Sequence, residues 1–271
     1  MAFYSYVCIL KEYKKLFTMK KITFMLLVLC GLCTACEKDN SSITINYPVT
    51  DKYTALDVSN AFDVVVCDTI NEAKVTVRGG EHKNVIFKVE DGTLKIGFKN
   101  GLFHWYHGTA KVLLPRNIEL CDVELSGASS FRGDLQGDEV EVDASGSSNF
   151  YGNVSGLEVN VDLSGASDFE GYIDADKLDL EVSGSSSVKS AGICTEQLDM
   201  TVSGSSNVDA FGLESRKVTA KVSGSSDVKI SCCESITGSI SGSSDLYYKA
   251  LPGCTPVVNC STSGGSKVHA E

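Results

Sequence analysis

The chain has 271 residues, 42% of them hydrophobic and 22% charged, which is too apolar for a disordered protein and sufficient for one or two domains. Lys and Arg number 24 against 35 Asp and Glu, for a formal net charge of -11. Because affinity for nucleic acid comes largely from basic side chains that release counterions from phosphates, this balance argues against a nucleic-acid partner.

Residues 1–35 have the pattern of a secretory signal peptide. Lys20 and Lys21 follow Met19 and precede an apolar run of about 14 residues, below the roughly 18 that a transmembrane helix needs. A membrane-spanning anchor is therefore disfavoured. Met19 opens a better-formed signal than Met1 does, so we expect translation to begin at Met19.

Cys36 is the predicted lipidation site. Residues 34–36 resemble the end of a bacterial lipobox, in which small residues precede the Cys that receives the lipid, and residues 37–40 resemble the tethers of some outer-membrane lipoproteins. We expect residues 36–49 to be a lipidated N-terminus and tether. The alternative is ordinary signal-peptide cleavage, with Cys36 left as a plain thiol. Without residues 1–35 the chain has 19 basic and 34 acidic side chains, a net charge of -15 that suits a soluble, lipid-tethered domain.

A short motif recurs along the second half of the chain. Its Ser-Gly pairs are separated by 19, 19, 19, 20, 20, 18 and 22 residues. A near-constant period of about 20 indicates a stacked repeat array, since each unit is too small to bury its own apolar face. The pairs begin at Ser126, Ser145, Ser164, Ser183, Ser203, Ser223, Ser241 and Ser263.

The spacing inside the repeat predicts three inward-facing columns of side chains. Before each Ser-Gly pair, apolar residues such as Val159, Val161 and Leu163 alternate with polar ones, as in a strand with one buried face. With two further apolar columns and Gly-rich corners, this predicts an all-β parallel β-helix with rungs of about 20 residues, stacked about 4.8 Å apart. The Leu and Asn pattern of a leucine-rich repeat is missing. The second column is Phe131, Phe150, Phe169, Val188, Val208, Val228, Leu246 and Val268, and the third is Leu135, Val154, Ile173, Ile193, Leu213 and Cys233.

The Ser-Gly corner itself has two predicted roles. Gly stands at the second position of every copy, as expected where the backbone needs a positive φ or where rungs approach closely. The Ser at the fourth position should point inward and form a hydroxyl ladder that satisfies backbone groups at the bend. These serines are Ser129, Ser148, Ser167, Ser186, Ser206, Ser226, Ser244 and Ser266.

Residues 43–115 also alternate between apolar and polar positions, so we expect strands there too. Residues 58–64 look like a degraded copy of the corner at residues 182–188. The solenoid is therefore predicted to begin near residue 55, with irregular early rungs that cap its end against edge-to-edge pairing.

The order of these features resembles the head GIN domain family of auto-transporter adhesins, which is common among surface lipoproteins. The resemblance rests on residues 55–66 and 89–96 and on rungs that open like residues 125–129. It covers residues 50–268, which we expect to form one domain, and it implies a β-helical fold, a cell-surface setting and no catalytic residue to carry over. We therefore expect a lipoprotein at the surface of the bacterial outer membrane, with a non-catalytic adhesin-like or structural module for a surface glycan or protein.

Seven cysteines follow Cys36, an odd number for an oxidising compartment. Cys121 and Cys260 stand in the inward phase of their strands and are expected to be small core residues. Alternatively, Cys254 and Cys260 could close a C-terminal loop as a disulfide. Beyond Cys36 no Cys-x-x-Cys pair occurs, which disfavours a zinc cluster.

Residues 103–107 form the most chemically dense segment. His104 and His107 flank Trp105 and Tyr106, so these four residues could contact a ligand, either a metal ion or a stacked sugar ring. The favoured alternative is an aromatic hairpin tip or cap over the first rungs, because the spacing supplies no further metal ligands. We predict neither a metal site nor a cofactor.

Carboxylates alternate with the buried residues of the triplet strands and form an acidic stripe. Stacked carboxylates can collect Ca²⁺, but the Gly-Asp nonapeptide of calcium-binding β-rolls is missing, so a solvated face is expected. No Gly-x-Ser-x-Gly nucleophile elbow occurs, and no catalytic residue is predicted. The alternative is a β-helical polysaccharide lyase or hydrolase, which would need clustered carboxylates with Lys, Arg or Tyr in a groove. The stripe comprises Asp122, Glu124, Glu141, Asp143, Asp162, Asp179, Glu181 and Asp199.

Overall fold

The structure is a computed structural model that describes residues 41–49, 51–78, 81–99 and 110–271. Strands make up most of this part of the chain, and its one helical element is a 3-10 turn, His82–Asn84. The predicted all-β class is confirmed. The residues from Ser42 to Glu271 form one compact unit.

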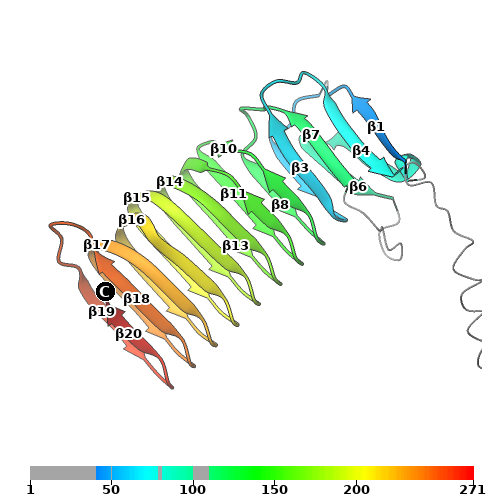
Figure 1. Ribbon diagram of the computed structural model, residues 1–271. Helices are drawn as coiled ribbons and strands as arrows, with labels where there is room; N and C mark the ends of the chain where they lie inside the picture. Colours follow the sequence, from blue (N-terminus) through cyan, green and yellow to red (C-terminus); the bar gives the residue numbers. More distant parts are fainter. Residues whose placement is uncertain (1–40, 50, 79–80, 100–109) are drawn as a thin grey trace, which may run out of the picture. The chain divides into compact units, whose positions relative to one another are not determined.

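From Asp122 onward the strands stack as parallel rungs. Strand β11 pairs in parallel with β8 on one side and β13 on the other, so that Val142 lies opposite both Val123 and Val161. The same arrangement continues through β17 and ends in β18, β19 and β20, which confirms the parallel β-helix of about 20 residues per rung (Figure 1). The strands are β8 (Asp122–Leu125), β9 (Ser130–Arg132), β10 (Leu135–Gln136), β11 (Glu139–Ala144), β12 (Asn149–Tyr151), β13 (Val154–Leu163), β14 (Asp168–Val182), β15 (Ser187–Val202), β16 (Asn207–Val222), β17 (Asp227–Ile240), β18 (Asp245–Ala250), β19 (Val257–Thr262) and β20 (Lys267–Ala270).

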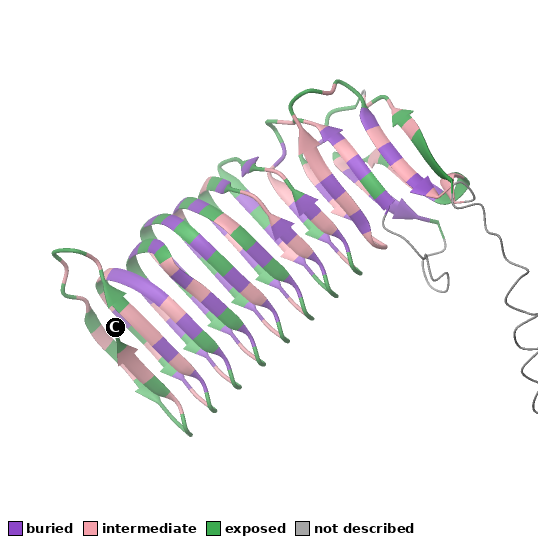
Figure 2. Cartoon of the chain, in the orientation of Figure 1, coloured by how far each residue is buried: buried purple, intermediate pink, exposed green. Residues whose placement is uncertain are grey.

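Two faces of the solenoid flank each Ser-Gly corner. We call the residues just before the corner, such as 178–182, the triplet face, and those just after it, such as 168–172, the Phe face. On both faces buried and exposed side chains alternate along each strand and align from rung to rung (Figure 2). Inside the Phe face, the Phe150 ring stacks between those of Phe131 and Phe169 at centroid distances of 5.4 and 5.1 Å. The core is therefore a set of continuous columns, as predicted.

The Ser-Gly corners follow the predicted geometry. Gly165 has φ of 76°, and a Cβ added there would lie 2.5 Å from the carbonyl oxygen of Gly146 in the adjacent rung. The Ser148 hydroxyl is buried and donates to the carbonyl oxygen of Ser145 at 2.8 Å, while the Ser148 amide donates to Ser167 Oγ at 3.3 Å. The inward hydroxyl ladder is thus confirmed, and it provides partners for backbone groups that the bend takes out of the strand ladder.

The N-terminal strands build an irregular cap, as predicted. Strand β2 pairs in parallel with β6 on one side and β8 on the other, and β3 pairs in the same way with β7 and β9. The rung of β6 and β7 is therefore nearer the N-terminal end of the stack than the rung of β2 and β3, although it comes later in the chain. Asn60 takes the place of the corner glycine, with φ of 65°. Antiparallel strands flank this cap: β1 pairs with β4, β4 with β7, and β5 with β6. The strands are β1 (Ser42–Tyr47), β2 (Ala55–Val58), β3 (Phe62–Cys67), β4 (Ala73–Arg78), β5 (Val85–Glu90), β6 (Thr93–Phe98) and β7 (Ala110–Pro115).

The third core column differs from the predicted set at two positions. Ile193 is 41% exposed, because Gly192 takes the inward place in β15 and the buried residue that follows is Cys194. In β17 the buried residue is Cys232, and Cys233 lies half-exposed beside it. Spacing between Ser-Gly pairs gives the length of a rung, but it does not give the place within the rung where a residue is added or removed.

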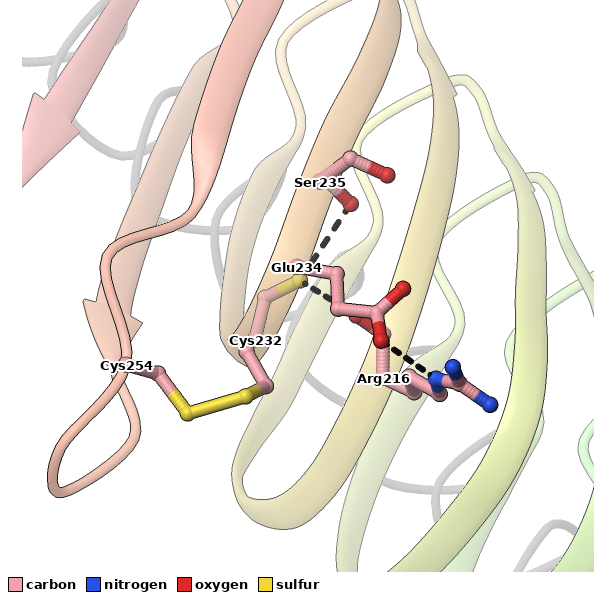
Figure 3. Close-up of a disulfide and its surroundings, with 6 residues drawn as sticks. Arg216, Cys232, Glu234, Ser235 and Cys254 are labelled. Atoms are coloured by element: carbon pink, nitrogen blue, oxygen red, sulfur yellow. Dashed lines mark hydrogen bonds and ion pairs between the residues drawn. A yellow bond between two sulfur atoms is a disulfide. The ribbon is translucent and has the colours of Figure 1, made fainter.

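One disulfide lies within the described residues, between Cys233 and Cys254, whose Cα atoms are 5.0 Å apart. It joins β17 to the loop that follows β18 (Figure 3). The alternative pairing of Cys254 with Cys260 is wrong, because Cys260 lies in β19 with its thiol free and packs half-buried against the core, close to its expected role. Cys121 also packs half-buried against the core, close to its expected role.

Candidate functional site

The predicted functional residues lie outside the described part of the chain. Cys36, the predicted lipidation site, belongs to residues 1–40, and His104, Trp105, Tyr106 and His107 belong to residues 100–109. In sequence, that second segment links β6 to β7. Among the described residues, the faces of the solenoid are the candidate binding surfaces.

The acidic stripe forms a ladder on the outside of the triplet face. Asp143 lies opposite Glu124 in one adjacent rung and Asp162 in the other. Burial, followed by repulsion from neighbouring carboxylates such as Glu141 and Asp162, raises the pKa of Asp143 to about 6. Burial and the same repulsion also raise the pKa of Asp122. Among the described residues, no group of three or more His, Cys, Asp or Glu side chains is arranged to hold a metal ion.

A shallow groove of about 790 Å³ runs along the edge where the third core column turns into the triplet face. Ile118 and Leu157, which are 66% and 58% exposed, stand at this groove. Gly137 and Gly156 belong to its lining. A Cβ added at Gly156 would come within 2.9 Å of the Gly137 carbonyl oxygen, so the two rungs pack closely here and no side chain rises from the floor of the groove at these positions. Its charged residues are all acidic: Glu119, Asp138, Glu139, Asp174 and Asp176.

The outside of the Phe face is a mixed surface of aromatic and charged side chains. Most of its aromatic rings are covered by a neighbouring cationic or ring group. Arg132 lies 4.2 Å from the ring centre of Tyr151, and Lys249 lies 4.0 Å from that of Phe211. Tyr247 and His269 stack with centroids 4.7 Å apart.

Tyr172 is the exception on this face. The residue is 45% exposed, and no ring or cation of the described residues covers its ring face. In the next two rungs its place is taken by Ala191 and then Gly212. These small residues leave a notch of about 420 Å³, lined by Glu170, Gly171, Tyr172, Lys189, Ser190, Ala191, Asp209 and Gly212, which we call the Tyr172 notch.

Ion pairs edge the Tyr172 notch. Lys189 Nζ lies 2.7 Å from a carboxylate oxygen of Glu170, and Lys229 Nζ lies 3.8 Å from one of Asp209. Glu170, Lys189, Asp209 and Lys229 follow one another in register along a column of the Phe face. The notch thus combines an open aromatic ring with balanced charges and hydrogen-bonding groups, in contrast to the acidic triplet face.

Sequence reasoning missed the Tyr172 notch. The available signal was the step from Tyr172 to Ala191 and Gly212 at roughly equivalent outward positions of three successive rungs, which places two small residues beside a large ring. A residue is also inserted here, since the register shifts between Lys189 and Ala191 and places Phe211 as the extra residue of β16. The position of this inserted residue is set by the strand pairing, which the spacing of Ser-Gly pairs does not specify.

The fold and these surfaces define a class: β-solenoid proteins whose outer faces are continuous side-chain ladders. The chain belongs to the family described as "Putative auto-transporter adhesin, head GIN domain", whose model matches residues 52–172 and 152–252. The family expected from the sequence is therefore confirmed. No curated protein matches the chain.

Solved structures share the fold. A "putative adhesin" from Parabacteroides distasonis is 21% identical with a TM-score of 0.75, over 86% of this chain and 98% of that chain. A "putative adhesin" from Parabacteroides merdae is 21% identical with a TM-score of 0.73, over 85% and 95%. A "putative lipid binding protein" from Parabacteroides distasonis is 19% identical with a TM-score of 0.73, over 86% and 98%. At these identities the likeness concerns the fold alone. No helix among the described residues is long and apolar enough to cross a membrane.

Proposed function

We propose that this protein is a lipoprotein of the bacterial outer membrane, exposed at the cell surface, that binds a surface ligand through the side of its solenoid and catalyses no reaction. The observation that carries the proposal is the Phe face, a long register of aromatic and charged side chains that presents binding groups on consecutive rungs. Membership of a family described as adhesins supports the same role.

The proposed arrangement of the chain follows from its sequence. Residues 1–35 would be removed as a signal peptide, residues 36–49 would form the lipidated N-terminus and tether, and residues 50–268 would form the binding domain. The disulfide between Cys233 and Cys254 supports export, because such bonds persist in oxidising compartments outside the cytoplasm.

A binding role is favoured over catalysis by the chemistry of the larger groove. Its charged lining residues are carboxylates, and none of its described lining residues is a Lys, Arg or Tyr. A polysaccharide lyase generally needs such groups, to neutralise a substrate acid and to transfer a proton, so the lining does not fit a lyase. A hydrolase works with a pair of carboxyl groups, so this rival has to be tested by activity. A screen of acidic and neutral polysaccharides for depolymerisation tests this rival, and rapid cleavage by the purified protein would overturn the proposal.

Anchoring and exposure can be tested together. Intact cells that express the wild type and Cys36→Ser are labelled with radioactive palmitate and treated with protease. The wild type should carry label and be cleaved on intact cells, whereas Cys36→Ser should lose the label and leave the membrane fraction. Cys67→Ser is the control, because Cys67 is a half-buried thiol of β3 and its variant should behave as wild type. Protection of the wild type from protease on intact cells would contradict surface exposure.

A further inference from the structure

We propose that the Tyr172 notch is a binding site for one sugar unit of a neutral glycan, whose ring stacks on Tyr172. This inference rests on the proposed binding role and specifies its ligand and its place. The elements that carry it are an open aromatic face, a space beside it, and a rim of charge-balanced hydrogen-bonding groups.

The ring of Tyr172 is open to a partner. A pyranose ring presents a face of C–H groups that packs against the face of an aromatic side chain, and Tyr adds a hydroxyl that can hydrogen-bond at the edge of the contact. Tyr151 and Phe211 on the same surface already have cationic side chains over their rings, from Arg132 and Lys249. Tyr172 is 45% exposed, and within the described part of the chain no ring or cation lies over its ring.

The space beside the ring is of a suitable size. Ala191 and Gly212 stand in register with Tyr172 over the next two rungs, a distance of about 9–10 Å at the spacing of paired strands. The notch measures about 420 Å³, within the range of roughly 300–1,000 Å³ usual for small-molecule sites. It is open along its length, so that a longer chain can continue over neighbouring rungs.

The rim determines which sugars fit. Glu170 and Asp209 can accept hydrogen bonds from sugar hydroxyls, and Lys189 can donate to ring or hydroxyl oxygens. Lys189 is paired with Glu170, and Lys229, which lies outside the lining, is paired with Asp209, so each charged group at the notch has a partner of opposite charge. A uronic acid would bring an unbalanced negative charge to a domain that is strongly acidic, so a neutral hexose or pentose is the better match.

A backbone irregularity sits at the same place. The pairing of β15 with β16 shifts register between Lys189 and Ala191, so that β16 has an additional residue, Phe211, next to the notch. Bulges of this kind redirect side chains and occur often beside binding sites. Here the insertion brings Gly212 into register with Ala191, which keeps the notch open over two rungs.

Binding of neutral hexasaccharides tests the proposal directly. The full-length chain, purified in detergent, is titrated by calorimetry with cello-, malto-, manno- and xylohexaose, and with an oligogalacturonate as the acidic comparison. We expect at least one neutral hexasaccharide to bind and the oligogalacturonate to bind more weakly. Tyr172→Ala, which removes the ring, and Ala191→Leu, which fills the notch from an exposed position, should each weaken binding by about tenfold or more.

Two variants separate recognition from folding. Tyr172→Phe keeps the ring and should retain most of the affinity. Leu157→Ala removes an exposed apolar side chain of the acidic groove, away from the Phe face, so it should bind as wild type. All variants should keep the wild-type circular dichroism spectrum. The inference is overturned if no neutral hexasaccharide binds, or if Tyr172→Ala and Ala191→Leu bind as tightly as wild type.

The failure of this inference can be told apart from failure of the proposed function. If wild type adheres to a lawn of bacterial or epithelial cells and Tyr172→Ala adheres equally well, the binding role stands and the Tyr172 notch is not its site. If wild type neither adheres to cells nor binds any oligosaccharide, both are rejected.

Discussion

Replacing Asp143 by Asn should stabilise the protein at neutral pH. Asp143 is a half-buried member of the acidic ladder, and burial together with repulsion by its neighbours raises the pKa of its carboxyl from 3.8 to about 6. At about 1.4 kcal/mol per pH unit, this rise corresponds to about 3 kcal/mol. Because the carboxyl is still in contact with solvent, screening reduces the effect to about 1–2 kcal/mol. Asn removes the charge while keeping nearly the same shape.

The sign of the pH dependence follows from the direction of the shift. Since the pKa of Asp143 is higher in the folded state, its stabilising contribution is fully present below pH 3.8 and is lost as the pH rises through about 6. The stability of the wild type should therefore fall relative to Asp143→Asn between about pH 4 and pH 7, by the same 1–2 kcal/mol.

Urea unfolding followed by circular dichroism measures this difference across the pH range. Asp174→Asn is a matched control, because Asp174 is an exposed aspartate of β14 that lies away from the acidic ladder. Its stability should follow that of wild type at every pH. A gap between wild type and Asp143→Asn that is the same at pH 4 and pH 7, or a variant that is less stable at pH 7, would refute the reasoning.

Three further predictions concern the core and the cysteines. Phe150→Ala should lower the free energy of unfolding by about 3–5 kcal/mol, since it removes the middle ring of the Phe stack; a loss below 1 kcal/mol in urea unfolding would argue against a continuous column. Replacing Cys233 and Cys254 together by Ser should cost about 3 kcal/mol, because the bond closes a loop of 21 residues, and reductant should lower the urea midpoint of wild type but not of the variant. Cys194 should resist alkylation in the folded protein at neutral pH, since burial raises the pKa of its thiol to about 11; mass spectrometry that finds it modified without denaturant would contradict this.

The regular rungs could be predicted because each of them meets the same packing requirement with the same residues. The corner glycine, illustrated by Gly165, must both adopt a positive φ and let the next rung approach, and no other residue satisfies both requirements. The buried corner serine, illustrated by Ser148, must bond a backbone carbonyl at the bend. Because each rung must meet these requirements, the same residue types recur at the same positions of every repeat. Their spacing therefore predicts both the solenoid fold and the length of its rungs.

The cap and the cysteine pairing lacked such a trace. The rung of β6 and β7 lies outside the rung of β2 and β3, so stacking order there is not chain order. Spacing alone cannot reveal this, because alternation marks strands but not their partners. The partner of Cys254 likewise depends on which strand lies next to its loop. That strand is β17, which contains Cys233.

In a solenoid, functional sites are expected at outward positions where the repeat is irregular. Where every rung has the same residue type at a position, the position serves stacking, and a departure from the column is either neutral or functional. Tyr172, Ala191 and Gly212 follow Asp134 and Asn153 at an outward position that has no common residue type, and the step from a large ring to two small residues is accompanied by an added residue, Phe211. On the inside, the change from Phe169 to Val188 in the same rungs leaves the core column buried and intact. In the second core column the irregularity therefore affects only the outward side chains and the bulge, where core packing does not require it and where a ligand can make contact.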